Sequence, residues 1–212
     1  MDKIDKVLKY TGKIKVLTGL HIGAGNDAVE IGGSDSPVIK DKISGMPYIP
    51  GSSVKGRMRW ILEKSRGEYA IDQRRNEGVP GDDPNKVTTK LFGSNSANTT
   101  VSPTRVIFRD CYLTSEYVKK FKDGEWDIEL KMENTIDRIS GKTRQGGLRN
   151  SERVPAGVVF DFNMGLLIIE GDNEAEFKKV IEEGIKLLEL TYIGGSGSRG
   201  YGSVKFEEMK WE

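Results

Sequence analysis

The stretch V-V-F-D-F-N-M-G-L-L-I-I, Val158 to Ile169, carries the strongest structural signal in the chain. Its apolar character is typical of a strand that is largely buried. The next segment, N-E-A-E-F-K-K-V-I-E-E-G-I-K-L-L-E-L, Asn173 to Leu190, predicts a helix because its apolar residues recur at helical spacing. The side chains expected to face inward are Phe177, Val180, Ile181 and Leu188. A glycine loop then leads into a last strand over I-G-G-S-G-S-R-G-Y-G-S-V-K-F, Ile193 to Phe206.

A second unit of this kind is predicted nearer the N-terminus. Residues Val7 to His21 favour a strand, because isoleucine and valine alternate with lysine in K-I-K-V, residues 13–16. P-G-S-S-V-K-G-R-M-R-W-I-L-E-K, Pro50 to Lys64, predicts a helix with Ser52 or Ser53 as its N-cap. R-V-I-F-R-D-C-Y-L, Arg105 to Leu113, predicts the strand that follows.

The predicted helix of residues 50–64 separates apolar from basic side chains. Its apolar stripe consists of Val54, Met58, Ile61 and Leu62. The cations Lys55, Arg57 and Arg59 therefore lie off that stripe. Gly56 marks a place where another backbone could approach the helix closely.

Two strand–helix–strand halves predict an α+β fold with a ferredoxin-like core, the layout that also underlies RNA-recognition (RRM) domains. We expect one domain over residues 1–212, with its core in residues 6–64, 105–132 and 157–212. Residues 65–104 are expected to form an insertion, of which the polar stretch 65–90 is predicted to be partly disordered. Residues 133–156 are basic and glycine-bearing, and predict a projecting hairpin.

Composition narrows the function classes. Apolar residues are 36% and charged residues 31%, which predicts a modest core with long polar excursions. The net charge is only +1, but basic residues gather within residues 42–66 and 138–153, as in proteins that bind a polyanion locally. Cys111 is the only cysteine, so a disulfide within the chain and a cysteine-based zinc site are excluded and a cytoplasmic location is expected. The N-terminus lacks the apolar core of a signal peptide and no run is long enough to span a bilayer, so no membrane partner is expected.

A lone acid stands on a Gly/Ser loop in I-G-G-S-D-S-P-V-I-K-D, Ile31 to Asp41. Asp35 could be an ordinary turn residue that hydrogen-bonds its own backbone, ahead of a short strand over Pro37 to Asp41. It could also be a functional carboxylate, since the loop can approach a ligand closely. The residues alone leave both interpretations open.

Two other segments are suited to phosphate. The glycine loop G-G-S-G-S-R-G-Y-G, Gly194 to Gly202, follows a helix and so does not match a dinucleotide fingerprint, but its N–H groups and Arg199 could contact phosphates. The N-terminus of the predicted helix offers N–H groups beside Ser52 and Ser53. A flexible turn and an ordinary capped helix are the simpler alternatives. His21 is the only histidine, which leaves no Cys/His dyad and no histidine cluster for a metal.

These segments together resemble the RAMP superfamily of CRISPR proteins. The motifs that carry the resemblance occur in order along most of the chain: G-L-H-I-G (19–23), D-S-P-V-I-K-D (35–41), Y-I-P-G-S-S-V-K-G-R-M-R (48–59), L-F-G-S (91–94) and the glycine loop (194–202). The D-S-P-V segment in a chain this short is most similar to the repeating backbone subunit of type III-A (Csm) effector complexes.

The resemblance implies a guide-RNA-binding subunit that polymerises in copies of itself and assembles with other subunits of the Csm complex. It also implies that the chain cuts complementary target RNA at regular intervals, as an endoribonuclease with Asp35 as the catalytic residue. Asp35 could act as a base or hold a divalent cation, such as Mg²⁺, weakly. The residues expected to bind RNA are His21, Ser52, Ser53, Lys55, Arg57, Arg59, Gly194, Gly195, Ser196 and Arg199. Residues 133–153 correspond by position and charge to the family's thumb hairpin.

Two other functions stay open. The chain could be a structural RNA-binding subunit in which Asp35 is only a turn residue. It could also be a related endonuclease that processes precursor RNA, which would need a histidine or tyrosine base near the glycine loop, where Tyr201 lies.

Overall fold

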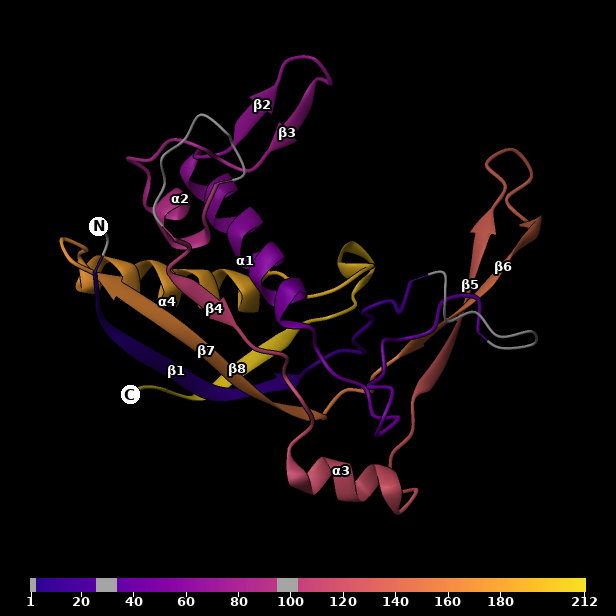
Figure 1. Ribbon diagram of the computed structural model, residues 1–212. Helices are drawn as coiled ribbons and strands as arrows, with labels where there is room; N and C mark the ends of the chain where they lie inside the picture. The colour runs from indigo at the N-terminus through magenta and orange to yellow at the C-terminus, as the bar shows by residue number, and fades with distance from the viewer. Residues whose placement is uncertain (1–2, 26–33, 95–102) are drawn as a thin grey trace.

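The computed structural model describes residues 3–25, 34–94 and 103–212 (Figure 1). Its centre is a four-stranded antiparallel sheet in the order β4 (Val106–Phe108), β7 (Val159–Ile169), β1 (Ile4–Val16), β8 (Val204–Trp211). β1 and β7 are the central strands and pair along most of their length, for example through Ile14 and Phe160. The prediction of a mixed α+β domain is confirmed.

Helices α1 (Gly51–Arg66) and α4 (Glu174–Leu190) cover one face of this sheet (Figure 1). The predicted inward residues are buried on α4, namely Phe177, Val180, Ile181 and Leu188, and on α1 at Val54, Met58 and Leu62, whereas Ile61 of the predicted α1 stripe is only partly buried. The close approach expected at Gly56 is wrong, because a Cβ there would meet nothing within 4 Å. The close approach is at Gly184 of α4 instead, where a Cβ would lie 2.8 Å from Met58 Cγ.

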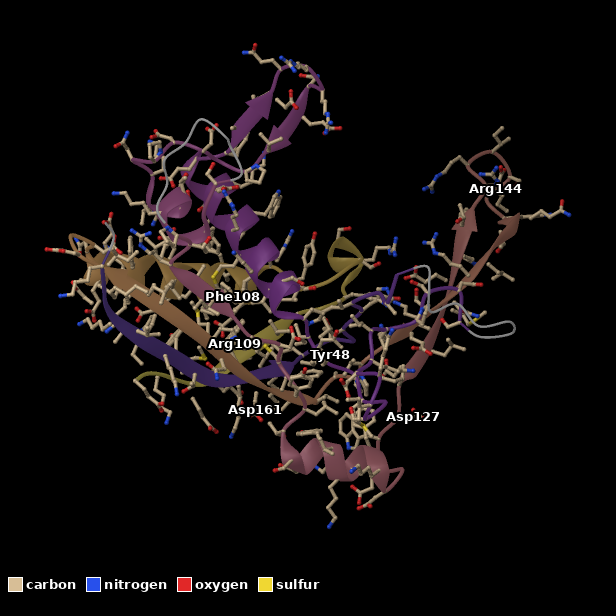
Figure 2. All side chains as sticks on the ribbon, viewed as in Figure 1. Tyr48, Phe108, Arg109, Asp127, Arg144 and Asp161 are labelled. Atoms are coloured by element: carbon tan, nitrogen blue, oxygen red, sulfur yellow. The ribbon has the colours of Figure 1, made fainter. Side chains whose placement is uncertain are left out.

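The opposite face of the sheet exposes polar side chains in the middle of β7, namely Asp161 and Asn163. Along β7, Phe160 and Phe162 point into the core, whereas Asp161 points away from the helices (Figure 2). This alternation is the two-residue period of a strand with one buried face.

The start of α1 differs from its prediction. The N-cap is Pro50, which has no side chain that could cap, and Ser52 and Ser53 lie within the first turn. The carboxylate of Asp110, beyond β4, accepts the N–H of Gly51 at 2.8 Å and so caps the helix from a distant segment. Gly51 is required there because a Cβ would lie 2.9 Å from the backbone of Arg109.

Several predicted strands are shorter in the structure. β1 ends at Val16, before His21, and β4 covers three residues of the predicted 105–113. Residues 37–41 form only isolated bridges, between Val38 and Gly23 and between Lys40 and Pro47.

The first insertion is more ordered than predicted. It contains the short hairpin β2 (Ala70–Asp72) and β3 (Glu77–Val79), followed by α2 (Val87–Phe92). Leu91 and Phe92 of α2 join the core, so residues 65–104 are not solely a polar excursion. Residues 95–102 of this insertion, and the Gly32 and Gly33 that precede Asp35, lie outside the described residues.

The second insertion is the predicted hairpin. β5 (Glu129–Ile136) and β6 (Thr143–Arg153) form a separate two-stranded sheet that extends away from the core, with Arg144 near its far end (Figures 1 and 2). It begins before the predicted boundary at residue 133. An additional helix, α3 (Ser115–Lys122), lies on the connection between β4 and β5 and was not predicted. No helix within the described ranges is long and apolar enough to cross a membrane.

Candidate nucleic-acid interface

The loop that carries Asp35 is attached to the outer edge of β6. The backbone N–H of Asn150 donates to Asp35 Oδ2 at 2.9 Å, and the backbone N–H of Asp35 donates to Asn150 Oδ1 at 2.6 Å. Ser34 adds a hydroxyl hydrogen bond to the same Oδ1 at 3.1 Å. Asp35 nevertheless stays exposed. An acid on a Gly/Ser loop is therefore presented to solvent from the base of the hairpin.

His21 joins the same loop to β6. Its Nδ1 lies 2.7 Å from the carbonyl oxygen of Glu152 and its Nε2 lies 3.2 Å from Ser36 Oγ. Because a carbonyl oxygen can only accept, Nδ1 carries the hydrogen, and in the neutral ring Nε2 accepts from the Ser36 hydroxyl. Both ring nitrogens of this predicted RNA-binding residue are thus used to hold the loop.

The glycine loop packs directly behind His21. The N–H of Gly195 donates to the His21 carbonyl at 2.9 Å, and Gly194 has φ of 79°. A Cβ on Gly194 would lie 2.3 Å from that carbonyl oxygen, so only glycine fits. Ser196 and Arg199 lie further along the loop, beside the short 3₁₀ turn η2 (Gly197–Arg199).

Arg57 connects α1 to the glycine loop. Its guanidinium lies 4.3 Å from the ring centroid of Trp60 and 3.9 Å from that of Tyr192, and its Nε donates to the Tyr192 carbonyl at 3.2 Å. Tyr192 in turn packs against Gly197, where a Cβ would overlap its ring. The structure therefore brings the predicted segments 55–59 and 194–199 together at Arg57, and both aromatic rings hold its guanidinium in place.

Arg59 occupies a different environment from Arg57. Its Nε donates to Glu63 Oε1 at 2.7 Å, its Nη2 donates to the Gly81 carbonyl at 3.0 Å, and the Glu63 side chain is only 6% exposed. This guanidinium anchors the first insertion to α1, and the predicted contact of Arg59 with RNA stays a prediction.

Ser52 and Lys55 lie on the side of α1 that faces β4. They line a surface cavity of about 470 Å³ together with Phe108. Burial lowers the pKa of the Lys55 ammonium, and the nearby Arg59 lowers it further. Ser53 lies in the same first turn and is half-buried.

A carboxylate that the sequence analysis did not single out lies where the hairpin meets the glycine loop. Glu133 accepts from the Tyr201 hydroxyl at 2.9 Å and from Arg149 Nη2 at 3.1 Å, and Arg199 Nη2 lies 3.3 Å from it. Burial alone would raise the pKa of the Glu133 carboxyl, but these partners lower it overall. Burial and the Glu133 carboxylate raise the pKa of Tyr201, so its hydroxyl stays protonated and donates.

The Glu133 cluster opens to solvent. A cavity of about 400 Å³ is lined there by Lys131, Glu133, Arg149 and Arg199 among others, with three cations against one carboxylate. The sequence does contain one signal for Glu133, namely the charges that alternate along both strands of the hairpin. Across the hairpin, Glu129 pairs with Arg153 and Glu133 pairs with Arg149.

A resident metal ion has few ligands at Asp35. Among residues 3–25, 34–94 and 103–212, no group of three or more His, Cys, Asp or Glu side chains is placed to hold one. One Asp35 oxygen is also already bonded to a backbone N–H. The described residues do not build a metal site by themselves, and the involvement of a divalent cation stays a prediction.

Comparison with known proteins gives the class that this fold and site define. The RAMP superfamily matches residues 13–205. The chain belongs to that superfamily and, within it, to the family of the CRISPR endoribonucleases named Csm3.

Relatives in this family cover nearly the whole chain. It is 46% identical to the "CRISPR system Cms endoribonuclease Csm3" of Methanocaldococcus jannaschii over 94% of this chain and 78% of that protein. It is 43% identical to the protein of the same name from Streptococcus thermophilus, over 96% of this chain and 88% of the relative. A crystal structure of the Csm3-Csm4 subcomplex of the type III-A CRISPR-Cas interference complex has a chain that matches with a TM-score of 0.63 and 32% identity, over 99% of this chain and 80% of that one.

Proposed function

We propose that this chain is the guide-RNA-binding backbone subunit of a type III-A CRISPR interference complex and that it cuts complementary target RNA at regular intervals. The observation that carries the proposal is the exposed Asp35 carboxylate, held at the base of the hairpin by the backbone N–H of Asn150. Guide RNA, target RNA, further copies of the chain and other Csm subunits are the partners that this function requires. The family's subunits support this, since a related chain is solved together with Csm4.

We also infer that the four-stranded sheet is a ferredoxin-like core. Strands and helices follow the order β1, α1, β4, β7, α4, β8, and the two central strands come one from each half of the chain. This is the β-α-β-β-α-β arrangement of that fold. Its exposed loops and hairpin are where RNA would bind.

Binding would rely on the RNA backbone. Arg57, Arg199 and Arg149 present guanidinium groups at the glycine loop and the hairpin, and such groups bind phosphates without reading bases. This suits a subunit that must accept any guide.

Cleavage would use the 2′-hydroxyl that neighbours the scissile phosphate. Asp35 takes the proton of that hydroxyl, the 2′-oxygen bonds to phosphorus, and the bond from phosphorus to the 5′-oxygen breaks. The leaving oxygen takes a proton from water. The products are a 2′,3′-cyclic phosphate and a 5′-hydroxyl, and no step is assigned to a metal ion.

The decisive variant is Asp35→Asn in the assembled complex. Loss of a positioned base should slow single-turnover cleavage of complementary RNA by on the order of 10²-fold or more. Removal of a negative charge should leave guide and target binding intact or slightly stronger. A parallel reaction in EDTA tests for a divalent cation, and loss of cutting there would mean that an ion is required.

Asp41→Asn is the matched control, because Asp41 only caps a turn. Its Oδ1 accepts the backbone N–H and the hydroxyl of Ser44, and the hydrogen bonds from Ser44 lower its pKa. This variant should lose a little stability and keep cutting.

A structural subunit that does not cut is the second candidate. It is favoured by one observation, that the Asp35 carboxylate accepts the backbone N–H of Asn150 and so helps to attach its loop to the hairpin. Equal cleavage rates for the wild type and Asp35→Asn would establish that Asp35 has only this role.

A further inference from the structure

Asn150 of β6 contacts the loop of residues 34–40 at Asp35 itself. Its side-chain Oδ1 accepts both the Asp35 N–H at 2.6 Å and the Ser34 hydroxyl at 3.1 Å, and its own N–H donates to the Asp35 carboxylate at 2.9 Å. Asn150 therefore fixes the backbone and the side chain of Asp35 at once.

We propose that Asn150 is a positioning residue for cleavage, which sets the orientation of the Asp35 carboxylate and links it to the hairpin. The proposal rests on the proposed function, since it needs Asp35 to act in cleavage. One carboxylate oxygen is held by β6, and within the described residues the other has no hydrogen-bond partner, which would leave it able to face the RNA. A base must be held within hydrogen-bond reach of the proton that it removes, so this orientation matters for the rate.

The other contacts between β6 and the loop of Asp35 explain why a single asparagine can affect cleavage. Further along the loop, Ser36 accepts the Glu152 N–H through its carbonyl at 2.9 Å, and Val38 donates to the Glu152 carboxylate at 3.0 Å. Lys40 lies 3.3 Å from that carboxylate. Glu152 thus holds residues 36–40, while Asn150 holds the loop at Ser34 and Asp35, next to the glycines that precede them in sequence.

The contacts between β6 and this loop also couple the hairpin to Asp35. Asn150 pairs with Met132 of β5, so its backbone is part of the hairpin sheet. A displacement of the hairpin moves the N–H that orients Asp35. RNA that engages the hairpin would in this way align or misalign the carboxylate, and cutting would depend on the position of the hairpin as well as on RNA binding.

The test compares Asn150→Ala with Asn150→Asp in assembled complexes. Alanine removes the acceptor for both donors, whereas aspartate keeps an oxygen in its place. Single-turnover cleavage at saturating target should fall on the order of 10-fold to 100-fold for Asn150→Ala, with target affinity unchanged. Asn150→Asp should recover most of that loss.

The matched control is Asn134→Ala, the same substitution on the same hairpin. The Asn134 side chain donates to Thr143 across the hairpin at 3.2 Å. Its loss should change the cleavage rate less than twofold.

Three outcomes would overturn the proposal: a wild-type rate in Asn150→Ala, a rate in Asn150→Asp as low as in Asn150→Ala, or an equal loss in the control. Asn150→Ala could also lower target affinity by loosening the hairpin. In that case Asn150→Asp alone decides, and a wild-type affinity together with a wild-type rate in Asn150→Asp supports the acceptor role.

A double variant separates this inference from the proposed function. Asn150→Ala should slow nothing further in an Asp35→Asn background, whereas unchanged cutting by Asp35→Asn alone refutes the proposed function itself.

Discussion

Two arginines on one helix show how neighbouring positions receive different roles. Arg57 and Arg59 are two residues apart on α1, so about 200° of helix rotation separates them. One turns toward the glycine loop and is held between two aromatic rings. The other turns toward the first insertion and pairs with Glu63, a nearly buried carboxylate.

The two arginines should therefore fail differently when replaced by alanine. Arg59→Ala leaves the Glu63 carboxylate buried without its partner and should cost about 3–5 kcal/mol of unfolding free energy. Arg57→Ala should keep most of the stability, weaken RNA binding alike for all sequences, and flatten its salt dependence by about one phosphate contact. Thermal unfolding and salt-dependent RNA titration measure the two effects. A sequence-selective loss in Arg57→Ala would contradict a backbone contact.

At the scale of elements, two separate sets of contacts hold the hairpin to the core. One joins β6 to the loop of Asp35, and the other joins Glu133 of β5 to Tyr201 and Arg199 of the C-terminal segment. The first set of contacts includes the candidate base, Asp35, and the second joins the Glu133 carboxylate to Arg199. The base of the hairpin is thus where RNA contacts and chemistry can affect each other.

The contacts of the Glu133 carboxylate with Tyr201, Arg149 and Arg199 should weaken in acid. Its partners lower the folded-state pKa of Glu133 below the unfolded value of about 4.3. A lowered pKa contributes stability above the unfolded value, and that stability is lost as the pH falls through the folded value. Between about pH 5 and pH 3 the wild type should lose more unfolding free energy than Glu133→Gln, which has no proton to gain there. Denaturant titrations across this range measure the unfolding free energy of both proteins. Equal losses in the wild type and in Glu133→Gln would show that the Glu133 contacts contribute nothing to stability.

The sequence predicts elements better than it predicts contacts between them. The helix at residues 173–190 and its inward face follow from periodicity alone, and the hairpin follows from charge and glycine content. The cap of α1 could not be predicted, because Asp110 lies far away in sequence and reaches the helix only in the folded chain. Helix α3 is only eight residues long, and its apolar residues Tyr117, Val118 and Phe121 are only partly buried against the core, so its stripe is too short to give a strong signal.

The same limit applies to the candidate site. Asp35 stands out in the sequence as a lone acid on a Gly/Ser loop that has no basic residue within four positions on either side. Its partner Asn150 carries no such signal, since a single asparagine in a basic hairpin is unremarkable until the loop is seen against it. Glu133 was passed over for the same reason, as its partners come from two other parts of the chain.

At the scale of the whole molecule, much surface lies outside the core. Only 36% of the residues are apolar, and the hairpin exposes several of its large apolar side chains, with Leu130, Met132 and Leu148 at 58%, 60% and 65% exposure. A hairpin that extends away from the sheet buries little of its own surface (Figure 1). Such a shape suits a protein whose surface is completed by RNA and by neighbouring copies.

Assembly should therefore follow the length of the RNA. Contacts between copies along a guide join different surfaces of each copy, and such head-to-tail contacts do not close into a ring. Native mass measurements on guides of increasing length should show a ladder in which each fixed increment of RNA adds one copy. High salt should shorten the ladder, because the phosphate contacts weaken. A guide too short for two copies is the control and should carry one. A single copy at every guide length would contradict the polymerising subunit, and a closed ring of fixed size would contradict the head-to-tail geometry.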